Sequence, residues 1–122
     1  MKYLALIYGS DADWAALSDD ERNAVYERYR AFGEEARAAG KLVDGAELQP
    51  ATTATTVRVR GDETVVTDGP FAETREQLGG YYVLDCDSLD EAVALAAKIP
   101  AAQHGTIEVR PEHVEDREEA VA

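Results

Sequence analysis

The residues with the clearest capacity for chemistry lie between Val66 and Thr74, where a β-branched strand runs into an Asp-Gly-Pro-Phe turn. Asp68 ends that strand, and a carboxylate that faces a cavity there becomes a stronger base, because burial disfavours its charged form. Such a group can act as a general base. An aspartate before Gly-Pro also commonly accepts hydrogen bonds from N–H groups of its own turn. Both roles are open for Asp68.

Polar and aromatic side chains near the turn are candidates for ligand binding. Glu73 and Arg75 follow the turn and could orient a small polar ligand, although a solvated loop or an exposed ion pair explains them equally well. Tyr8 and Tyr81 lie in predicted strands, from which their hydroxyls could enter a pocket. Packing in a core or an interface is the commoner use of such tyrosines.

The chain shows no other motif of a known chemistry. Its two histidines, His104 and His113, and its single cysteine have no metal-site spacing. Gly79-Gly80 does not belong to a phosphate-binding pattern, and no nucleophile elbow is present. We therefore expect no cofactor and no metal. Cys86 follows a predicted strand without a local base, which favours a packed thiol.

The composition describes one soluble, acidic domain. A chain of 122 residues can bury a core without disulfides. Its 25 acidic and 12 basic residues give a net charge of −13, which disfavours nucleic acids and anionic membranes as partners. The N-terminus lacks the pattern of a signal peptide, which favours a cytoplasmic location.

In the first half of the chain we expect a strand, a helix and a second strand. Apolar residues occupy both the odd and the even positions from residue 3 to residue 8, which indicates that residues 2–8 form a strand covered on both faces. Residues 9–14 are expected to form a polar loop, and Ser18 with Glu21 predicts a capping box that opens a helix. That helix ends at Gly40 and buries one face, and residues 41–48 form the next strand. The expected buried face consists of Val25, Tyr29, Phe32, Ala36 and Ala39.

The second half is expected to contain a hairpin, a strand, a helix and a final strand. Residues 56–60 and 63–67 flank Gly61-Asp62, a two-residue turn between β-branched runs. Residues 80–86 form a strand, and Ser88 with Glu91 predicts a second capping box. The second helix should bury Leu89, Ala92, Val93, Ala96 and Ile99 and end at Pro100, before a strand at 106–110. Residues 1–111 would form the domain, with 112–122 as an acidic tail.

The predicted order of elements favours an α+β fold. Two βαβ units with a hairpin inserted between them give a ferredoxin-like antiparallel sheet with its helices on one face. The other face would be left bare, although its strands carry apolar residues. We therefore expect this face to pair with a second copy of the chain in a closed homodimer.

The sequence resembles the DGPF group of the YCII-related proteins. The likeness lies in residues 68–71, in the string from Glu73 to Tyr81, in the first strand, and in residues 99–102 and 107–111. It implies a dimeric α/β barrel. For the wider YCII group it implies a His/Asp pair in a pocket, and at least one relative eliminates chloride from an aromatic substrate. It also implies an association with sigma factors in some members. Neither His104 nor His113 lies on the first predicted helix, where the likeness places a histidine.

Two hypotheses about function follow from the sequence. In the first, a homodimer binds a small organic molecule in a cavity between sheet and helices, beside the turn. Asp68 would act there as the base of cofactor-free proton transfer or elimination, and Glu73, Arg75 or a tyrosine would orient the substrate. In the second, the protein is a non-catalytic regulatory module that associates with a sigma factor, and its acidity suits a basic partner. The sequence alone does not decide whether the protein is an enzyme.

Overall fold

The computed structural model describes residues 1–115 and contains two long elements of note, a helix of 20 residues and a strand of nine. The elements in chain order are β1 (Lys2–Gly9), α1 (Asp11–Ala16), α2 (Asp19–Ala38), β2 (Leu42–Glu47), the 3-10 turn η1 (Ala51–Thr53), β3 (Thr55–Arg60), β4 (Glu63–Asp68), β5 (Gln77–Asp85), α3 (Leu89–Ala96), the 3-10 turn η2 (Pro100–Gln103) and β6 (Thr106–Pro111).

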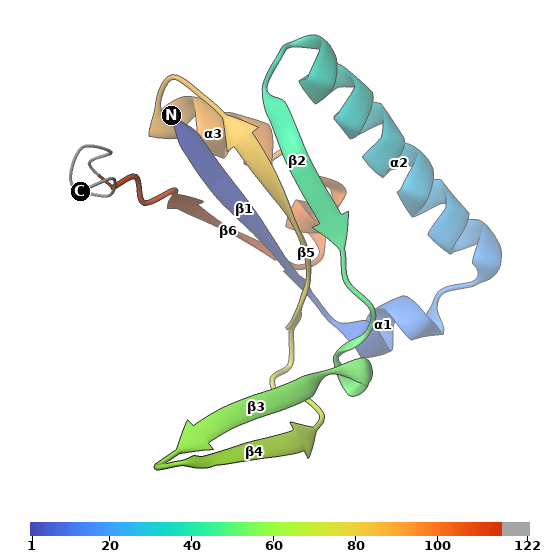
Figure 1. The fold of residues 1–122 in the computed structure, drawn as a ribbon. Helices are drawn as coiled ribbons and strands as arrows, with labels where there is room; N and C mark the ends of the chain where they lie inside the picture. The colour runs from blue at the N-terminus through green and yellow to red at the C-terminus, as the bar shows by residue number, and fades with distance from the viewer. Residues whose placement is uncertain (116–122) are drawn as a thin grey trace.

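Four strands form one antiparallel sheet in the order β2-β5-β1-β6, and β3 pairs only with β4. The two central strands, β1 and β5, each belong to a different βαβ half, which is the ferredoxin-like arrangement. Figure 1 shows α2 running along one face of the sheet, while no helix covers the opposite face within residues 1–115. The predicted α+β fold, with the helices on one face and an inserted hairpin, is confirmed.

The core lies between the sheet and the helices. Strand β1 contributes two residues to it, β5 and the position just after it contribute one each, α2 contributes two, and α3 with the segment after it contributes three. The buried core residues are Tyr3, Ala5, Phe32, Ala36, Leu84, Cys86, Ala92, Ala96 and Ile99. The Cys86 thiol is buried as expected, and its burial raises its pKa.

Local signals in the sequence set the ends of α2. The Ser18 hydroxyl accepts a hydrogen bond from the Glu21 N–H at 3.1 Å, and the Glu21 carboxylate accepts one from the Ser18 N–H at 2.9 Å. This reciprocal capping box confirms the predicted start. Gly40 follows the helix with φ at 73°, a conformation that glycine adopts without steric cost.

Three local expectations were wrong. Residues 11–16 form α1 rather than a loop, because the Ser10 hydroxyl accepts a hydrogen bond from the Asp13 N–H and caps a short helix. The second capping box is incomplete, because the Glu91 carboxylate accepts from the Asp87 N–H rather than from Ser88.

The third error concerns the buried faces of the two helices. Leu89 and Val93 of α3 are about half exposed, at 52% and 51%, because α3 has only eight residues and rests on the sheet through its alanines. Ala39 is also exposed, since it caps α2 at the point where the chain turns away.

The sheet face away from the helices is apolar at its centre. The register pairs Leu4 with Val83 and Leu6 with Tyr81, and these side chains alternate with the buried residues of β1 and β5. Tyr8 lies on the same side, since it pairs with Thr106 next to the inward-facing Ile107. We call this surface the open face; it comprises Leu4, Leu6, Tyr8, Tyr81 and Val83, all of which are only half-buried.

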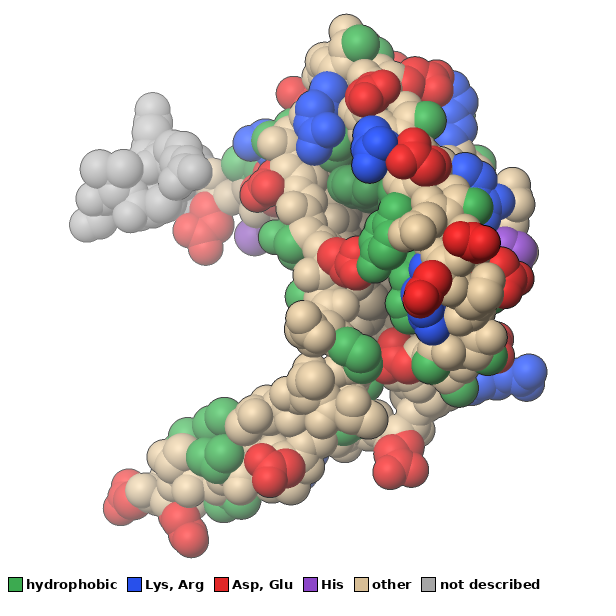
Figure 2. Space-filling view, turned by 90° about the vertical axis from the view of Figure 1, so that its right-hand side faces the viewer, with side chains coloured by type: hydrophobic (Ala, Val, Ile, Leu, Met, Phe, Trp, Pro, Cys, Tyr) green, Lys and Arg blue, Asp and Glu red, His purple; other side chains and the backbone are tan. Residues whose placement is uncertain are grey.

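Strands β3 and β4 form a hairpin that projects from the body, which we call the hairpin arm (residues 55–68). Its turn is the predicted Gly61-Asp62 pair, with φ of Gly61 at 62°. Figure 2 shows hydrophobic side chains gathered on the arm. They are Val57, Val59, Val65 and Val66, each between 41% and 61% exposed. A hairpin of two strands is marginally stable in water by itself.

The described helices are all too short or too polar to cross a membrane.

Candidate functional site

The Asp-Gly-Pro-Phe turn lies where the hairpin arm joins the body. The Gly69 N–H donates to the Ala54 carbonyl at 2.7 Å, and the Thr56 hydroxyl donates to the Gly69 carbonyl at 2.8 Å. With φ at 98°, Gly69 adopts a conformation that disfavours any residue with a side chain. Phe71 is 80% exposed. The hydrogen bonds of the turn therefore fix the base of the arm, while the Phe71 ring is exposed to solvent in the single chain.

Asp68 ends β4 at the base of the hairpin arm, where it pairs with Thr55 in the ladder. Its side chain is exposed, and it does not line either of the two cavities described below. Within residues 1–115 its carboxylate accepts no side-chain hydrogen bond from its own turn, because the Gly69 N–H is directed at Ala54 instead. A role for Asp68 therefore depends on what covers the arm.

A polar network anchors the segments around the turn. The Ala51 N–H donates to the Asp11 carboxylate at 2.9 Å, and the Asp11 N–H donates to the Gln77 side-chain oxygen at 2.9 Å. The Gln77 side-chain amide donates in turn to the Thr74 carbonyl. Through these bonds α1, η1 and the start of β5 hold the base of the arm in place.

The other predicted site residues are dispersed. Glu73 and Arg75 are exposed and form no ion pair with each other. Tyr8 and Tyr81 lie half-buried on the open face, away from α2. Within the single chain, the structure does not bring Asp68, Glu73, Arg75 and the two tyrosines together around one cavity.

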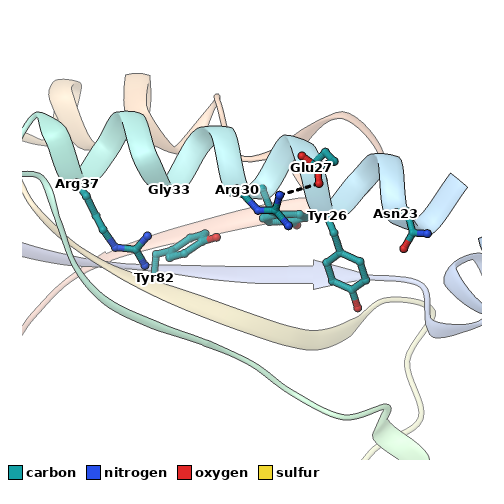
Figure 3. A pocket seen from close by; sticks show the side chains of 8 residues that line it. Asn23, Tyr26, Glu27, Arg30, Gly33, Arg37 and Tyr82 are labelled. Carbon is teal, nitrogen blue, oxygen red and sulfur yellow. Dashed lines mark ion pairs between the residues drawn. The ribbon is translucent and has the colours of Figure 1, made fainter. Parts of the chain in front are cut away.

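The larger of two cavities along α2 lies elsewhere, as a partly open groove between α2 and the edge of the sheet. It has a volume of ≈ 710 Å³ and we call it the helix cavity. Figure 3 shows its wall, in which α2 supplies all of the side chains except that of Tyr82, which comes from β5. The lining residues are Asn23, Tyr26, Glu27, Tyr29, Arg30, Gly33, Arg37 and Tyr82.

The phenols of this wall are kept neutral. Burial raises the pKa of Tyr29 to about 12, and burial also raises the pKa of Tyr82. The Tyr82 ring packs on Phe32 with the ring centroids 5.2 Å apart. Neutral hydroxyl groups at the edge of a core can donate hydrogen bonds to a bound molecule.

The two arginines of the cavity wall differ in whether they form an ion pair. The Arg30 guanidinium pairs with the Glu27 carboxylate at 2.8 Å, as the dashed line in Figure 3 marks. The Arg37 guanidinium lies beside the Tyr82 ring and forms no ion pair with any of residues 1–115. One wall of the cavity thus carries a positive charge that the described part of the chain does not neutralise.

A smaller cavity of ≈ 340 Å³ adjoins the first and shares Tyr26 with it. The Tyr26 hydroxyl donates to Glu47 at 3.0 Å, and its ring meets Trp14 edge to face at 5.4 Å. The remaining lining comes from Leu48, Gln49 and Pro50, directly before η1. The two cavities therefore form a path along α2 toward the base of the hairpin arm.

Sequence reasoning missed the residues of the helix cavity. Tyr29 was assigned to the core stripe of α2, and Arg37 looks like any cation in the last turn of a helix. The available signal was Gly33, a glycine in the middle of a predicted helix. A glycine there lowers the stability of the helix, so its presence suggests that a neighbouring group needs the space. Within residues 1–115, no cluster of three or more His, Cys, Asp or Glu side chains is placed to hold a metal ion.

Comparison with known proteins gives the family. The model of the YCII-related domain matches residues 1–112. This chain belongs to the YCII-related family. A curated relative of this YCII-related chain is the uncharacterized protein R00369 of Rhizobium meliloti (strain 1021). The two are 43% identical over 113 residues, which is 91% of each chain. The predicted family is thereby confirmed.

A solved structure with a similar fold is 5-chloro-2-hydroxyhydroquinone dehydrochlorinase (TftG) from Burkholderia phenoliruptrix AC1100, in complex with 2,5-dihydroxybenzoquinone. The TM-score is 0.54 and the sequence identity 15%, and the match covers 93% of this YCII-related chain and 94% of the other. At this identity the likeness shows a shared fold.

Proposed function

We propose that this YCII-related protein is a homodimer that binds a small organic molecule in the helix cavity and carries out cofactor-free proton transfer or elimination on it. The cavity is the observation that carries the proposal. Its ≈ 710 Å³ fall within the range of about 300–1,000 Å³ that is usual for small-molecule sites. Three tyrosines line the cavity beside four charged or amide side chains, so its wall is more polar than that of most such sites.

Two apolar surfaces support the homodimer. The open face presents Leu4, Leu6 and Val83 beside two tyrosines, although none of these residues is fully buried in the single chain. The hairpin arm exposes Val57, Val59 and Val66 on one of its faces, and Phe71 is exposed at its base. Contiguous apolar surfaces of this kind commonly mark an interface between proteins, and a second copy would cover both surfaces by symmetry.

The chemistry is proposed by analogy with the structural neighbour and from the turn. That neighbour is a dehydrochlorinase, and removal of hydrogen chloride from an organic ring requires a base. Asp68 is our candidate for the base, and Glu73 or Arg75 would orient the substrate, whereas Tyr8 and Tyr81 lie on the open face, across the sheet from the helix cavity. Because Asp68 lies on the exposed arm, this role requires dimer formation to bring its carboxylate beside a bound ligand.

A thermal-shift screen tests the binding function. The panel contains hydroxylated aromatics, aromatic and aliphatic acids, and sugars, and a ligand of the folded state raises the melting temperature. We expect a ligand to shift the amide resonance of Gly33, which lines the helix cavity. If no compound of the panel stabilises the dimer, or if a ligand binds only at the arm, the proposal is wrong.

Asp68→Asn tests the catalytic step. Product formation from the ligand of the screen, followed by mass spectrometry, should be lost, while the circular dichroism and the mass of the dimer stay unchanged. Asp62→Asn, at the turn of the same arm, is the matched control and should retain turnover. Unchanged turnover in Asp68→Asn would exclude Asp68 as the base, and loss of folding would assign it a structural role.

A regulatory module that associates with a sigma factor is the second candidate function. The net charge of −13 is the feature that favours it, because a basic partner surface would be attracted. A stable complex at low salt that dissociates at moderate salt would support it.

A further inference from the structure

The helix cavity has a cationic side chain built into its wall. Arg37 lies in the last turn of α2, where a cation also interacts favourably with the helix dipole. The Arg37 side chain runs back along α2, so that its guanidinium lies over Gly33 and beside Tyr82 (Figure 3). None of the carboxylates of residues 1–115 is within ion-pair distance of it, even though the chain contains 25 acidic residues.

Two glycines leave the space that this arrangement needs. A Cβ at Gly33 would lie 3.2 Å from an Arg37 guanidinium nitrogen. A Cβ at Gly45 of β2 would lie 2.6 Å from the Tyr82 ring and 2.8 Å from the backbone carbonyl oxygen of Tyr81. Glycine is unfavourable in the interior of a helix or a strand, so Gly33 and Gly45 make α2 and β2 less stable than alanine would if there were room for its side chain. What they provide is room for the Arg37 and Tyr82 side chains at the cavity wall.

The other charged groups argue against a cationic ligand. The carboxylate of Glu27 is already paired with Arg30 at 2.8 Å. The phenols of Tyr29 and Tyr82 stay protonated at neutral pH, since burial raises the pKa of each. The Arg37 end of the wall therefore presents one uncompensated positive charge beside neutral hydroxyl donors and aromatic rings. The Glu47 carboxylate, which forms no ion pair within residues 1–115, lies at the other end, where it accepts the hydrogen bond from Tyr26.

We infer that the helix cavity takes a small aromatic anion, whose charged group pairs with the Arg37 guanidinium and whose ring lies against Tyr82. The inference rests on the proposed small-molecule function and specifies its ligand class. A planar guanidinium binds a carboxylate or a phenolate through charge-assisted hydrogen bonds. A ring that stacks beside Tyr82 gains an aromatic contact in an offset or edge-to-face geometry.

Three probes of equal size separate charge from aromaticity. Benzoate is an aromatic anion, benzamide is its neutral analogue, and cyclohexanecarboxylate is an anion without an aromatic ring. Binding to the wild-type dimer is followed through the amide resonances of Gly33 and Gly45. A hydrogen bond to a charged group corresponds to roughly ten- to a hundred-fold in affinity, so benzamide should bind at least tenfold more weakly than benzoate. Cyclohexanecarboxylate should also bind more weakly than benzoate.

Arg37→Met removes the charge and keeps a long side chain. Because Arg37 is exposed, the variant should fold normally and lose at least tenfold in benzoate affinity while benzamide affinity is unchanged. Arg28→Met is the matched control, since it changes the charge of the same helix outside the cavity lining, and it should leave benzoate binding unchanged.

The outcomes separate this inference from the proposed function. Equal binding of benzoate and benzamide, or an equal loss in Arg28→Met and Arg37→Met, overturns the anion preference and leaves small-molecule binding intact. Failure of all three probes at the two glycine amides, when a neutral ligand from the screen binds there, overturns it as well. If neither the probes nor any compound of the screen binds, both the inference and the proposed function are wrong.

Discussion

At the scale of single residues, close backbone contacts decide which glycines are needed. Gly105, just before β6, is one example, because an added Cβ would collide with the carbonyl oxygen of Tyr8. Gly80 of β5 is another, with a Cβ position only 2.7 Å from the Ala46 carbonyl oxygen. Gly9 is different, since nothing lies within 4 Å of its Cβ position.

Gly105→Ala should therefore destabilise the protein by about 1–3 kcal/mol, the usual cost of overpacking. Gly9→Ala is the matched control and should change the free energy of unfolding by no more than about 0.5 kcal/mol. Urea denaturation of both variants gives the comparison. Equal stabilities would show that the strand ends near Tyr8 and Gly105 adjust freely.

Tyr29 makes the free energy of unfolding depend on pH in the alkaline range. Its folded pKa of about 12 lies above the ordinary value of 10.0, so the folded state holds its proton more tightly than the unfolded state does. The resulting stabilisation is complete below about pH 10 and is lost as the pH rises from about 10 to about 12.

Tyr29→Phe removes this contribution. The free energy of unfolding of the variant, measured by urea denaturation at about pH 9 and about pH 11, should fall less over that interval than that of the wild type. Identical slopes would mean that the hydroxyl is as well solvated in the folded state as in the unfolded state.

At the scale of elements, capping and alternation explain most of the chain. Ser18 starts α2 through its reciprocal bonds with Glu21, and alternation along β1 separates the core from the open face. The hairpin arm is the exception, because its strands expose both of their faces. Val57 pairs with Val66 on one face of the arm, while Val65 pairs with Arg58 on the other.

Val57→Lys tests whether that valine face contacts the second copy in the proposed homodimer. We expect the variant to shift from dimer to monomer in sedimentation, because a desolvated charge at an apolar contact is costly. Val65→Lys introduces the same charge on the opposite face of the arm and should leave the dimer intact. The same sedimentation behaviour in both variants would contradict a specific role for the valine face.

At the scale of the whole molecule, charge opposes the assembly that the apolar surfaces favour. Each copy carries a net charge of −13, so two copies repel each other. Salt screens this repulsion over a Debye length of about 30 Å at 0.01 M and about 8 Å at 0.15 M. The apolar contact itself is far less sensitive to such a change.

The dimer should therefore tighten as salt rises from about 0.01 M to about 0.15 M, as measured by the sedimentation equilibrium constant. Neutralising acidic residues far from the open face should reduce this salt dependence. A dimer that weakens with added salt would instead indicate an interface held by ion pairs.

The sequence by itself determined the family and the order of the elements. Local signals sufficed for this, because the capping box at Ser18, the Gly61-Asp62 turn and the apolar run of residues 2–8 each act within a few residues. The sequence also predicted the apolar open face, since both apolar faces of a strand must be packed against another layer. Its errors were likewise local: a six-residue helix at Asp11, and the exposed side of α3.

Only the tertiary structure decided where the predicted site residues lie and which cavity exists. Asp68 lies at the base of the arm and is close in sequence to Glu73 and Arg75, yet all three side chains are exposed, and no local rule predicts which groups surround them. Arg37 and Tyr82 are 45 positions apart in the printed sequence and meet because β5 lies in the sheet that α2 covers. A cavity depends on packing between distant segments, and spacing along the chain does not encode it.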